Sequence, residues 1–214
     1  MAMRSDNILP IFPLGLVLLP HMPMPLHIFE ERYKVMITEC IDQRQDFGLI
    51  YVKKSKIQRI GCSARITDVI KRYEDGRMDI LTVGGNRFLI TSIDETRPFL
   101  QGAVLYFDDE IEEPEQDLLE LGIRALELLK NMNRLVGRDT EGVPPEGADL
   151  SLLSFFIASH EGFSFDERQE LLEMTSPAAR IEREIELLDR KIEILNAREE
   201  IRRITGGNGK MRKV

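Results

Sequence analysis

Short apolar runs, several of which alternate with polar residues, fill the first half of the chain. They lie at 47–52, 62–73, 78–83, 87–93 and 99–107. Alternation and β-branched residues are typical of half-buried strands. The Asp75-Gly76 pair predicts a tight hairpin turn between the second and third runs. Gly84-Gly85-Asn86 predicts a second turn or a bulge, because glycine accepts backbone angles that strain other residues.

Helical spacing occurs once within this β-rich part and dominates after it. Between residues 30 and 42, apolar residues recur at intervals of three and four and predict a helix with one buried face. These residues are Tyr33, Met36, Ile37, Cys40 and Ile41. The pattern changes after the acidic segment 108–116, which predicts a subdomain boundary. Helices are then predicted at 115–135, 150–160, 165–174 and 177–204.

The last two helices carry clear start signals. Ser164 and Glu167 form a capping box, and Pro177 follows Ser176 at the first position of the final helix. Apolar residues of that helix form a seam with coiled-coil spacing. They are Ile181, Ile185, Leu188, Ile192 and Leu195. Because the seam spans only about two heptads, packing inside a bundle is favoured over a homodimer through 177–204, which stays open.

Composition narrows the class of protein. With 214 residues, of which 43% are hydrophobic and 31% charged, the chain is globular and forms one large or two small domains. A formal charge of −8 argues against a phosphate-binding surface over the whole molecule. Cys40 and Cys62 are far apart in apolar settings, which predicts two buried free thiols rather than a disulfide framework or zinc site.

The apolar stretch that begins at Ile11 is not predicted to be a targeting segment. Prolines interrupt it and Asp6 precedes it, unlike the basic start of a signal peptide. No run approaches the ~18–20 apolar residues that a membrane span requires. A cytoplasmic location is therefore expected, with no membrane partner.

Residues for catalysis or metal binding are sparse. The three histidines are His21, His27 and His160, and neither zinc-protease pattern around them is complete. No Gly-x-Ser-x-Gly motif occurs, and Gly209-Lys210 lacks the rest of a Walker loop. We therefore expect no catalytic residue, no metal and no cofactor.

The segment 21–25 places two methionines between prolines. Proline fixes the backbone, while methionine side chains are flexible and polarisable, a combination suited to varied apolar partners. Met22 and Met24 thus have two interpretations, as exposed binding residues or as core residues.

Ten positions near the start of the chain form a recognisable signature. They are Phe12, Pro13, Leu14, Pro25, Leu26, Ile28, Phe29, Glu30, Arg32 and Tyr33. Similar segments follow in order at 47–50, 60–66, 73–90 and 167–173. Together they resemble the Lon protease N-terminal domain family over roughly residues 7–200.

This resemblance implies an α+β fold in two parts. A β-rich, PUA-like barrel or sheet with one packed helix is expected over 1–110, and an α-helical bundle over 111–205, with a flexible basic tail at 206–214. In Lon proteases the module contributes to substrate recognition and precedes an ATPase and a serine–lysine protease domain. Neither follows here, so the peptidase activity that the family name indicates is not expected. At His21 the family commonly has glycine, and a positive φ would cost the histidine some stability.

The resemblance and the residues together favour a non-catalytic module that recognises protein segments. Leu18, Met22 and Met24 are the predicted peptide-binding residues, and free strand edges would add backbone hydrogen bonds. Glu30 and Arg32 either orient a bound segment or brace the start of the first helix.

The expected partners are unfolded or apolar segments, basic rather than strongly acidic because the protein is acidic. A separate protease or chaperone is a further candidate partner. Two other functions stay open. One is RNA binding, found among PUA-like domains but disfavoured by the acidic balance; the other is an enzyme with an unrecognised site.

Overall fold

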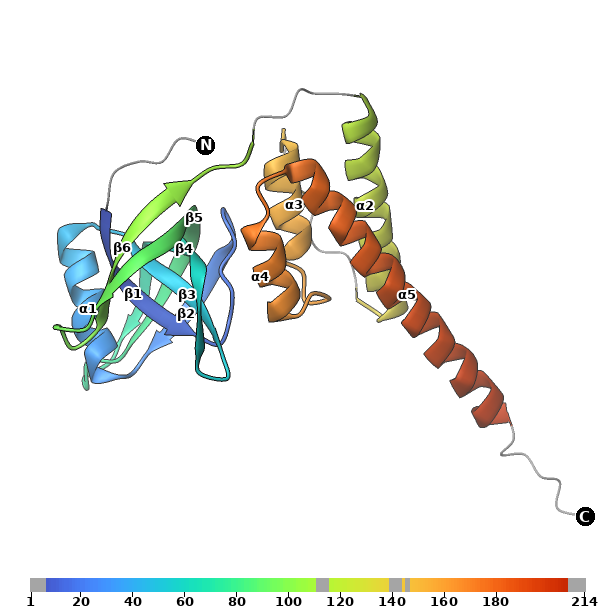
Figure 1. The fold of residues 1–214 in the computed structure, drawn as a ribbon. Coiled ribbons are helices and arrows are strands. Elements are labelled where there is room, and N and C mark those ends of the chain that lie inside the picture. The colour runs from blue at the N-terminus through green and yellow to red at the C-terminus, as the bar shows by residue number, and fades with distance from the viewer. Residues whose placement is uncertain (1–6, 111–115, 139–143, 145–146, 208–214) are drawn as a thin grey trace, which may run out of the picture. The chain divides into compact units, whose positions relative to one another are not determined.

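The computed structural model describes residues 7–110, 116–138, 144 and 147–207. It contains the predicted strands and helices in order, with two further strands before the first helix that the pattern does not predict, and the α+β class is confirmed (Figure 1). The elements are β1 Asn7–Leu14, β2 Pro23–Ile28, α1 Glu31–Gln43, β3 Phe47–Lys53, β4 Lys56–Arg72, β5 Met78–Asp94, β6 Leu100–Phe107, α2 Gln116–Leu135, α3 Leu150–Ala158, α4 Phe165–Glu173 and α5 Pro177–Gly207.

The six strands form one sheet in the order β2-β5-β4-β3-β1-β6, and β5 also pairs with β6. β1 pairs with β3, β3 with β4, β4 with β5, β5 with β6, and β6 with β1. β2 pairs only with the first part of β5. Only β1 and β3 are parallel. The two predicted runs 78–83 and 87–93 are one continuous strand, β5.

A bulge within β5 explains why these runs look separate in the sequence. Cys62 pairs with Arg87 and Ala64 with Gly84, so β5 holds one extra residue here. A Cβ atom on Gly84 would lie 2.0 Å from the Leu19 carbonyl oxygen. The glycine thus lets the β1–β2 connection sit against β5, and of the two predicted alternatives the bulge is the observed one.

The core of the strands is built from aliphatic and aromatic residues that alternate along β1, β3, β5 and β6. One cluster comprises Leu9, Ile11, Ile50, Phe88, Ile90 and Val104. The α1 helix buries Tyr33, Met36, Ile37 and Cys40, as its spacing predicts. The Tyr33 ring lies 4.1 Å from that of Phe12, between centroids, and joins α1 to β1.

Both cysteines are buried free thiols, as predicted. Burial raises the pKa of Cys40 to about 11 and that of Cys62 to about 12. Neither thiol is therefore a reactive thiolate near neutral pH.

The chain divides into two compact units. The β unit comprises the described residues up to Glu110 together with Ala158–Ser176, and the helical unit comprises those from Gln116 to Ile157 and from Pro177 onward. The predicted division differs from this arrangement because α4 belongs with the strands. The Gln169 side chain donates to the Ile60 carbonyl at 3.0 Å, and Arg87 donates to the Leu172 carbonyl at 3.2 Å.

The predicted start of α4 is correct in detail. Ser164 is the N-cap, its hydroxyl accepts the Glu167 backbone N–H, and the Glu167 carboxylate accepts the Ser164 N–H at 2.7 Å. Asp166 in the first turn accepts the Tyr51 hydroxyl and pairs with Lys53. These bonds fix α4 to β3.

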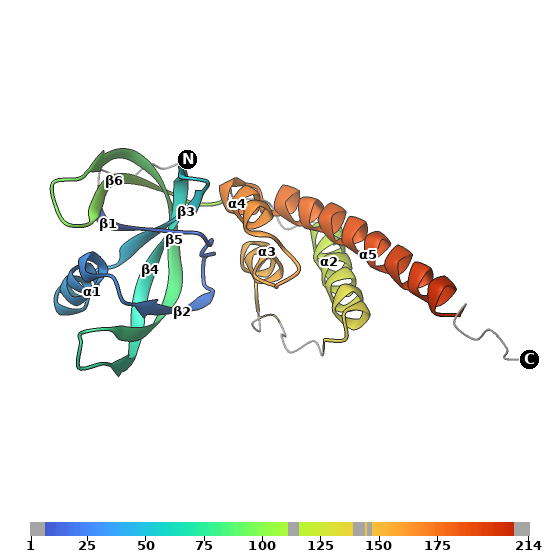
Figure 2. The ribbon, with the colours of Figure 1, turned by 90° about the horizontal axis from the view of Figure 1, so that it is seen from below.

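Helices α2, α3 and α5 form the helical unit, and α2 and α5 lie side by side in both ribbon views (Figures 1 and 2). Four seam residues of α5 are buried, which agrees with packing inside a bundle. They are Ile181, Ile185, Leu188 and Ile192.

Two charged residues of α5, Arg180 and Glu184, are buried. Arg180 is 0% exposed, and its Nε donates to Ser154 Oγ at 2.6 Å. One turn further along α5, the carboxyl oxygens of Glu184 are buried without a hydrogen-bond partner. Burial raises the pKa of Glu184 well above its usual range, against the opposing effect of Arg180.

Two predictions concern regions at or beyond the limits of the described residues. Most of the basic tail, 208–214, lies outside them, as do 111–115 of the predicted boundary. In the part of the chain that is described, no helix combines the length and apolarity needed to cross a bilayer.

Candidate binding groove

An open groove of about 650 Å³ lies in the β unit where β1 ends. It is lined by residues from four segments of the chain. They are Pro13, Leu14 and Gly15 at and just after the end of β1, Arg32 and Tyr33 from α1, Val52, Ser55 and Ile57 from the β3–β4 hairpin, and Glu95, Arg97, Pro98, Phe99 and Leu100 before and at the start of β6. A concave surface of this size, mostly apolar with a few polar groups, is typical of ligand sites.

The groove exists because neighbouring strands end at different places. β1 pairs with β6 only as far as Ile11, opposite Leu100, and with β3 as far as Leu14, opposite Tyr51. The β3–β4 hairpin continues beyond the end of β1. At that end stands Gly15, where an added Cβ would meet nothing within 4 Å.

Two arginine–aromatic pairs face the groove from different walls. The Arg32 guanidinium lies 4.5 Å from the Tyr33 ring centre and pairs with Glu30 at 2.8 Å. The Arg97 guanidinium lies 4.5 Å from the Phe99 ring centre. It also pairs with Glu39 on α1 at 2.6 Å. These pairs hold the rim in place, and stacked guanidinium groups still offer a flat face to a ligand.

The tip of the β3–β4 hairpin forms the wall around Ser55. Lys54 and Ser55 have φ angles of 48° and 65°, in the left-handed region that two-residue hairpins need and that asparagine and glycine adopt most easily. Lys53 stands directly opposite Lys56 in the ladder. Like charges opposite each other destabilise a strand pair. This hairpin therefore lacks the residues that its turn favours and places like charges opposite each other.

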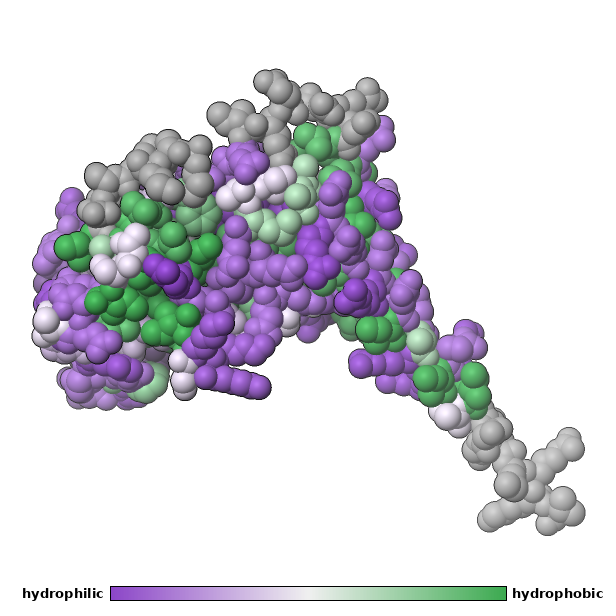
Figure 3. All heavy atoms as spheres, in the orientation of Figure 1, coloured by the Kyte–Doolittle hydropathy of each residue, from purple (hydrophilic) through white to green (hydrophobic). Residues whose placement is uncertain are grey.

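An apolar surface adjoins the groove through Ile57. It is lined by Ile57, Arg59, Ile90, Thr91, Ser92 and Ile93. A bulge in β5 follows Ile90, and Arg59 donates to the Ile90 carbonyl from two nitrogens at 3.1 and 2.7 Å. Figure 3 shows apolar residues gathered over one face of the β unit and interrupted by hydrophilic ones. Arg59 borders the groove without an acidic partner among the described residues.

The three predicted peptide-binding residues lie elsewhere. Leu18 is 1% exposed and packs beside Gly84, so the prediction that it offers a binding surface is wrong. Met22 and Met24 are half-buried. Along β2, Met24 shares the inward face with Leu26, while the prolines face outward. The methionines thus lie at the margin of the core, neither fully exposed as binding residues nor fully buried as core residues.

Residue His21, which precedes them, has a φ of 63°. Its N–H donates to the Gly84 carbonyl at 2.8 Å, and Gly84 N–H donates back to the Met22 carbonyl at 3.0 Å. His21 therefore has the positive φ that was considered because the family commonly has glycine at this position. The two hydrogen bonds with Gly84 hold this turn against the β5 bulge.

The free strand edges are poorly suited to pairing with a peptide. On β2, Met22 and Met24 direct their carbonyls toward β5, so Pro23 and Pro25 direct their backbone nitrogen, which carries no hydrogen, outward. Beyond Ala64, β4 has no β3 partner, but register shifts leave Thr67 and Ile70 as extra residues. Prolines and bulges protect edges from strand addition.

The ten signature residues separate into structural and exposed groups. Phe12, Leu26, Ile28 and Tyr33 are buried, and Pro13, Leu14, Arg32 and Tyr33 line the groove. Phe29 is 60% exposed, beside the His27 ring. Glu30 is the N-cap residue of α1, but its side chain makes no cap bond and instead pairs with Arg32.

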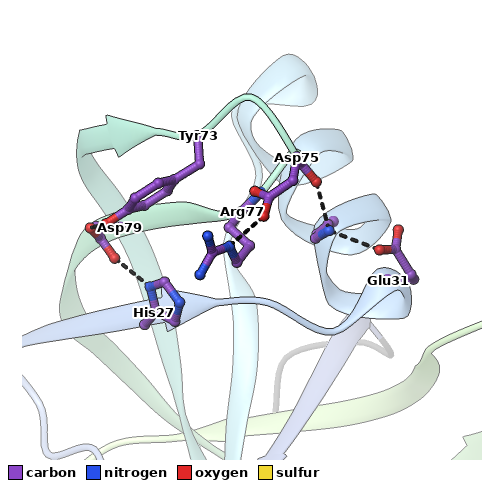
Figure 4. Close-up of polar contacts among 7 residues, drawn as sticks. His27, Glu31, Tyr73, Asp75, Arg77 and Asp79 are labelled. Atoms are coloured by element: carbon purple, nitrogen blue, oxygen red, sulfur yellow. Dashed lines mark hydrogen bonds and ion pairs between the residues drawn. The ribbon is translucent and has the colours of Figure 1, made fainter.

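The β4–β5 hairpin is held by a network of polar contacts (Figure 4). The Tyr73 hydroxyl donates to Asp79 at 2.8 Å, and His27 Nδ1 lies 2.6 Å from the same carboxylate. Asp75 pairs with Arg77 at 2.7 Å. The contact with His27 holds the pKa of Asp79 below its usual range, with the Tyr73 bond acting in the same direction.

Sequence reasoning missed most of the groove. Val52, Phe99 and Leu100 were predicted only as strand residues, and Ile57 and Arg97 were not singled out. Among the described residues, no three histidine, cysteine or carboxylate side chains gather in a way that could hold a metal ion.

Comparison with known proteins places the chain among relatives of one kind. A family model described as the ATP-dependent protease La (LON) substrate-binding domain matches residues 8–190. The chain is 24% identical over 208 residues to the Lon protease of Rhizobium meliloti (strain 1021), covering 90% of this chain and 25% of that protein. It is 27% identical to Lon protease 2 of Myxococcus xanthus, covering 88% and 24%. The chain thus spans about a quarter of the length of these relatives.

Solved structures show the same fold. The crystal structure of a Lon N-terminal domain protein from Xanthomonas campestris has a TM-score of 0.63 at 24% identity, covering 82% of this chain and 95% of that one. The N-terminal domain of the Mycobacterium avium complex Lon protease has a TM-score of 0.65 at 17% identity, covering 86% and 98%.

Proposed function

Since the family match spans residues 8–190, the chain belongs to the Lon substrate-binding domain family, and from this premise we propose that it recognises unfolded polypeptide segments. The segment binds in the groove at the end of β1. Recognition is non-catalytic. Any peptide-bond cleavage is the work of a separate protease domain or protein.

One observation carries this proposal. The groove joins four signature positions to apolar residues from two other loops, and its apolar floor is open while the strand edges are blocked by prolines and bulges. An extended, apolar segment fits such a surface, because binding removes apolar surface of both the segment and the groove from water. Side-chain burial in the groove, rather than strand addition, supplies the affinity.

Met22 and Met24 form a second, weaker candidate surface. Their half-exposed side chains stand outside the groove-lining set. In this proposal they support the core margin and the turn on Gly84. Loss of both side chains lowers stability more than it lowers affinity for a polypeptide.

Gly15 provides a direct test of the groove. Its backbone φ is not positive, and an added side chain has open space, so Gly15→Trp fills the groove without disturbing the fold. We expect at least a tenfold loss of affinity for a labelled, permanently unfolded protein, measured by fluorescence anisotropy. Ala197→Trp, on the exposed side of α5, is the matched control and leaves affinity unchanged.

The Met22→Ser/Met24→Ser variant separates the two surfaces. If it abolishes binding while it stays folded and Gly15→Trp binds like the parent, the groove assignment is wrong and the methionine loop is the recognition surface. If the parent shows no saturable binding at all, the proposed function itself fails.

A further inference from the structure

Three charged side chains line the groove, and only two of them have ion-pair partners. The Arg32 guanidinium pairs with Glu30, and the Arg97 guanidinium pairs with Glu39. Glu95 is the single carboxylate among the lining residues, and it has no ion pair or side-chain hydrogen bond among the residues that the structure describes. The lining residues and their partners thus hold three carboxylates and two guanidinium groups. The charge that the groove leaves unbalanced is negative.

The Glu95 carboxylate lies on a loop whose backbone is held on both sides. Before it, the Asp94 carboxylate accepts the Thr96 backbone N–H at 2.9 Å and the Thr96 hydroxyl at 3.1 Å. After it, the Arg97 guanidinium lies over the Phe99 ring, 4.5 Å from the ring centre. The Thr96 backbone N–H, as the main cause, holds the pKa of Asp94 below its usual range. Asp94 therefore adds a second negative charge beside Glu95 at neutral pH.

The apolar surface that adjoins the groove carries one cation, Arg59. Its guanidinium is directed at the Ile90 carbonyl, to which it donates at 3.1 and 2.7 Å. Arg59 is not among the residues that line the groove, whereas Glu95 is. Within the groove itself, the charge without a partner is therefore the Glu95 carboxylate.

Lysine and arginine side chains suit a surface of this composition. Each has an aliphatic stem and a cationic head, so the stem can cover apolar surface while the head stays at a charged, hydrated rim. In the groove, Leu14, Val52 and Leu100 supply the apolar surface, and Glu95 supplies the anion. A purely apolar side chain uses only the first of these, and an acidic side chain is repelled by the second.

We infer that the groove selects polypeptide segments in which apolar residues are flanked by lysine or arginine, and that Glu95 sets this preference. The apolar residues of the segment cover Leu14, Val52 and Leu100, and the cationic head pairs with Glu95. This inference rests on the proposed function and names its substrate class. Charge complementarity between the unpaired carboxylate and a basic flank is the observation that carries it.

Three labelled peptides of about twelve residues test the inference. They share one apolar centre and differ in flanks of lysine, glutamine or glutamate. We expect the lysine-flanked peptide to bind about threefold more tightly than the glutamine-flanked one at about 50 mM salt, and the glutamate-flanked one to bind most weakly. The preference shrinks as salt is raised.

The variant Glu95→Gln is expected to lose this preference while it keeps its affinity for the glutamine-flanked peptide. Glu199→Gln, on an exposed part of α5, makes the same change in net charge and keeps the preference. The two variants together separate a charge that acts in the groove from the overall negative charge of the protein. Thermal unfolding of each variant shows that it is folded.

Failure of the inference is distinguishable from failure of the proposed function. If the glutamine-flanked peptide binds and Gly15→Trp blocks it, yet lysine flanks give no gain, the inference is overturned and the proposed function stands. If Glu95→Gln prefers lysine flanks as strongly as Glu199→Gln does, the preference comes from the overall charge and the inference is wrong. If the glutamate-flanked peptide binds most tightly, Arg32 and Arg97 set the preference and the inference is again wrong. If no peptide binds, both are overturned.

Discussion

Two hairpins of the β unit follow opposite rules. At the β4–β5 turn, Gly76 takes the positive φ of 82°, and Asp75 pairs with Arg77. At the β3–β4 turn, Lys54 and Ser55 take positive φ angles, and Lys53 faces Lys56. The first turn is built from residues that suit its geometry, whereas the second is not.

The difference shows that the less favourable of the two turns is the one that contributes residues to the groove. The β4–β5 hairpin is braced by Tyr73, Asp79 and His27 and stands apart from the groove-lining residues (Figure 4). The unfavourable β3–β4 hairpin contributes Ser55 and Ile57 to the groove. Local backbone strain at Ser55 therefore coincides with the proposed binding surface.

The largest effect is expected from breaking the favourable turn. Gly76→Val forces a β-branched residue into a positive φ and lowers the free energy of unfolding by about 2 kcal/mol. Space does not limit the change, because the nearest atom to an added Cβ is a Lys34 carbon at 3.6 Å. Urea unfolding measures the loss. Gly15→Val, without a positive φ, is the control and stays within about 0.5 kcal/mol of the parent.

Repairing the unfavourable turn has a smaller effect of opposite sign. Lys54→Asn/Ser55→Gly supplies the pair that such turns prefer and raises the free energy of unfolding by about 1 kcal/mol. Affinity for the labelled unfolded protein falls because Ser55, which lines the groove, is lost. A variant that gains stability and also binds more tightly would contradict the link between strain and recognition.

Charge reversal at the same hairpin sharpens the comparison further. Lys56→Glu places opposite charges across the ladder from Lys53 and raises the melting temperature, by less than the turn replacement does. A fall in melting temperature would show that Lys56 makes a stabilising contact instead.

The smallest effect concerns acid sensitivity of the β4–β5 hairpin. Because the folded pKa of Asp79 is lowered, its contribution is present above the unfolded value of about 3.9 and is lost as pH falls through the folded value. Asp79→Asn should melt below the parent at pH 6 and approach it near pH 2. An equal difference at both pH values would exclude this linkage.

Local rules in the sequence predict local structure well. The Asp75-Gly76 turn, the Ser164–Glu167 capping box and the start of α5 at Pro177 all need only neighbouring residues, and each is observed. The bulge at Gly84 could be narrowed only to two alternatives, because its partner, Leu19, comes from a distant loop.

The groove could not be predicted in the same way. It depends on strand ends that stop at different places, and Leu14, Val52 and Leu100 look like ordinary strand residues in the sequence. One signal was available: the tight turn Lys54-Ser55 lies between two further lysines and lacks glycine. The prediction that Leu18 is an exposed binding residue failed because the sequence of a proline-rich loop does not show whether an apolar side chain faces the core or the solvent.

Amide chemical-shift mapping with a short, unfolded apolar peptide tests the central claim most directly, because it locates the bound segment residue by residue. The account predicts saturable shifts at 13–15, 32–33, 52–57 and 97–100, with residues 22–24 and the β4–β5 turn at 74–77 unchanged. Shifts centred on 22–24, or on the β4–β5 turn, with none at the β3–β4 hairpin, would contradict it.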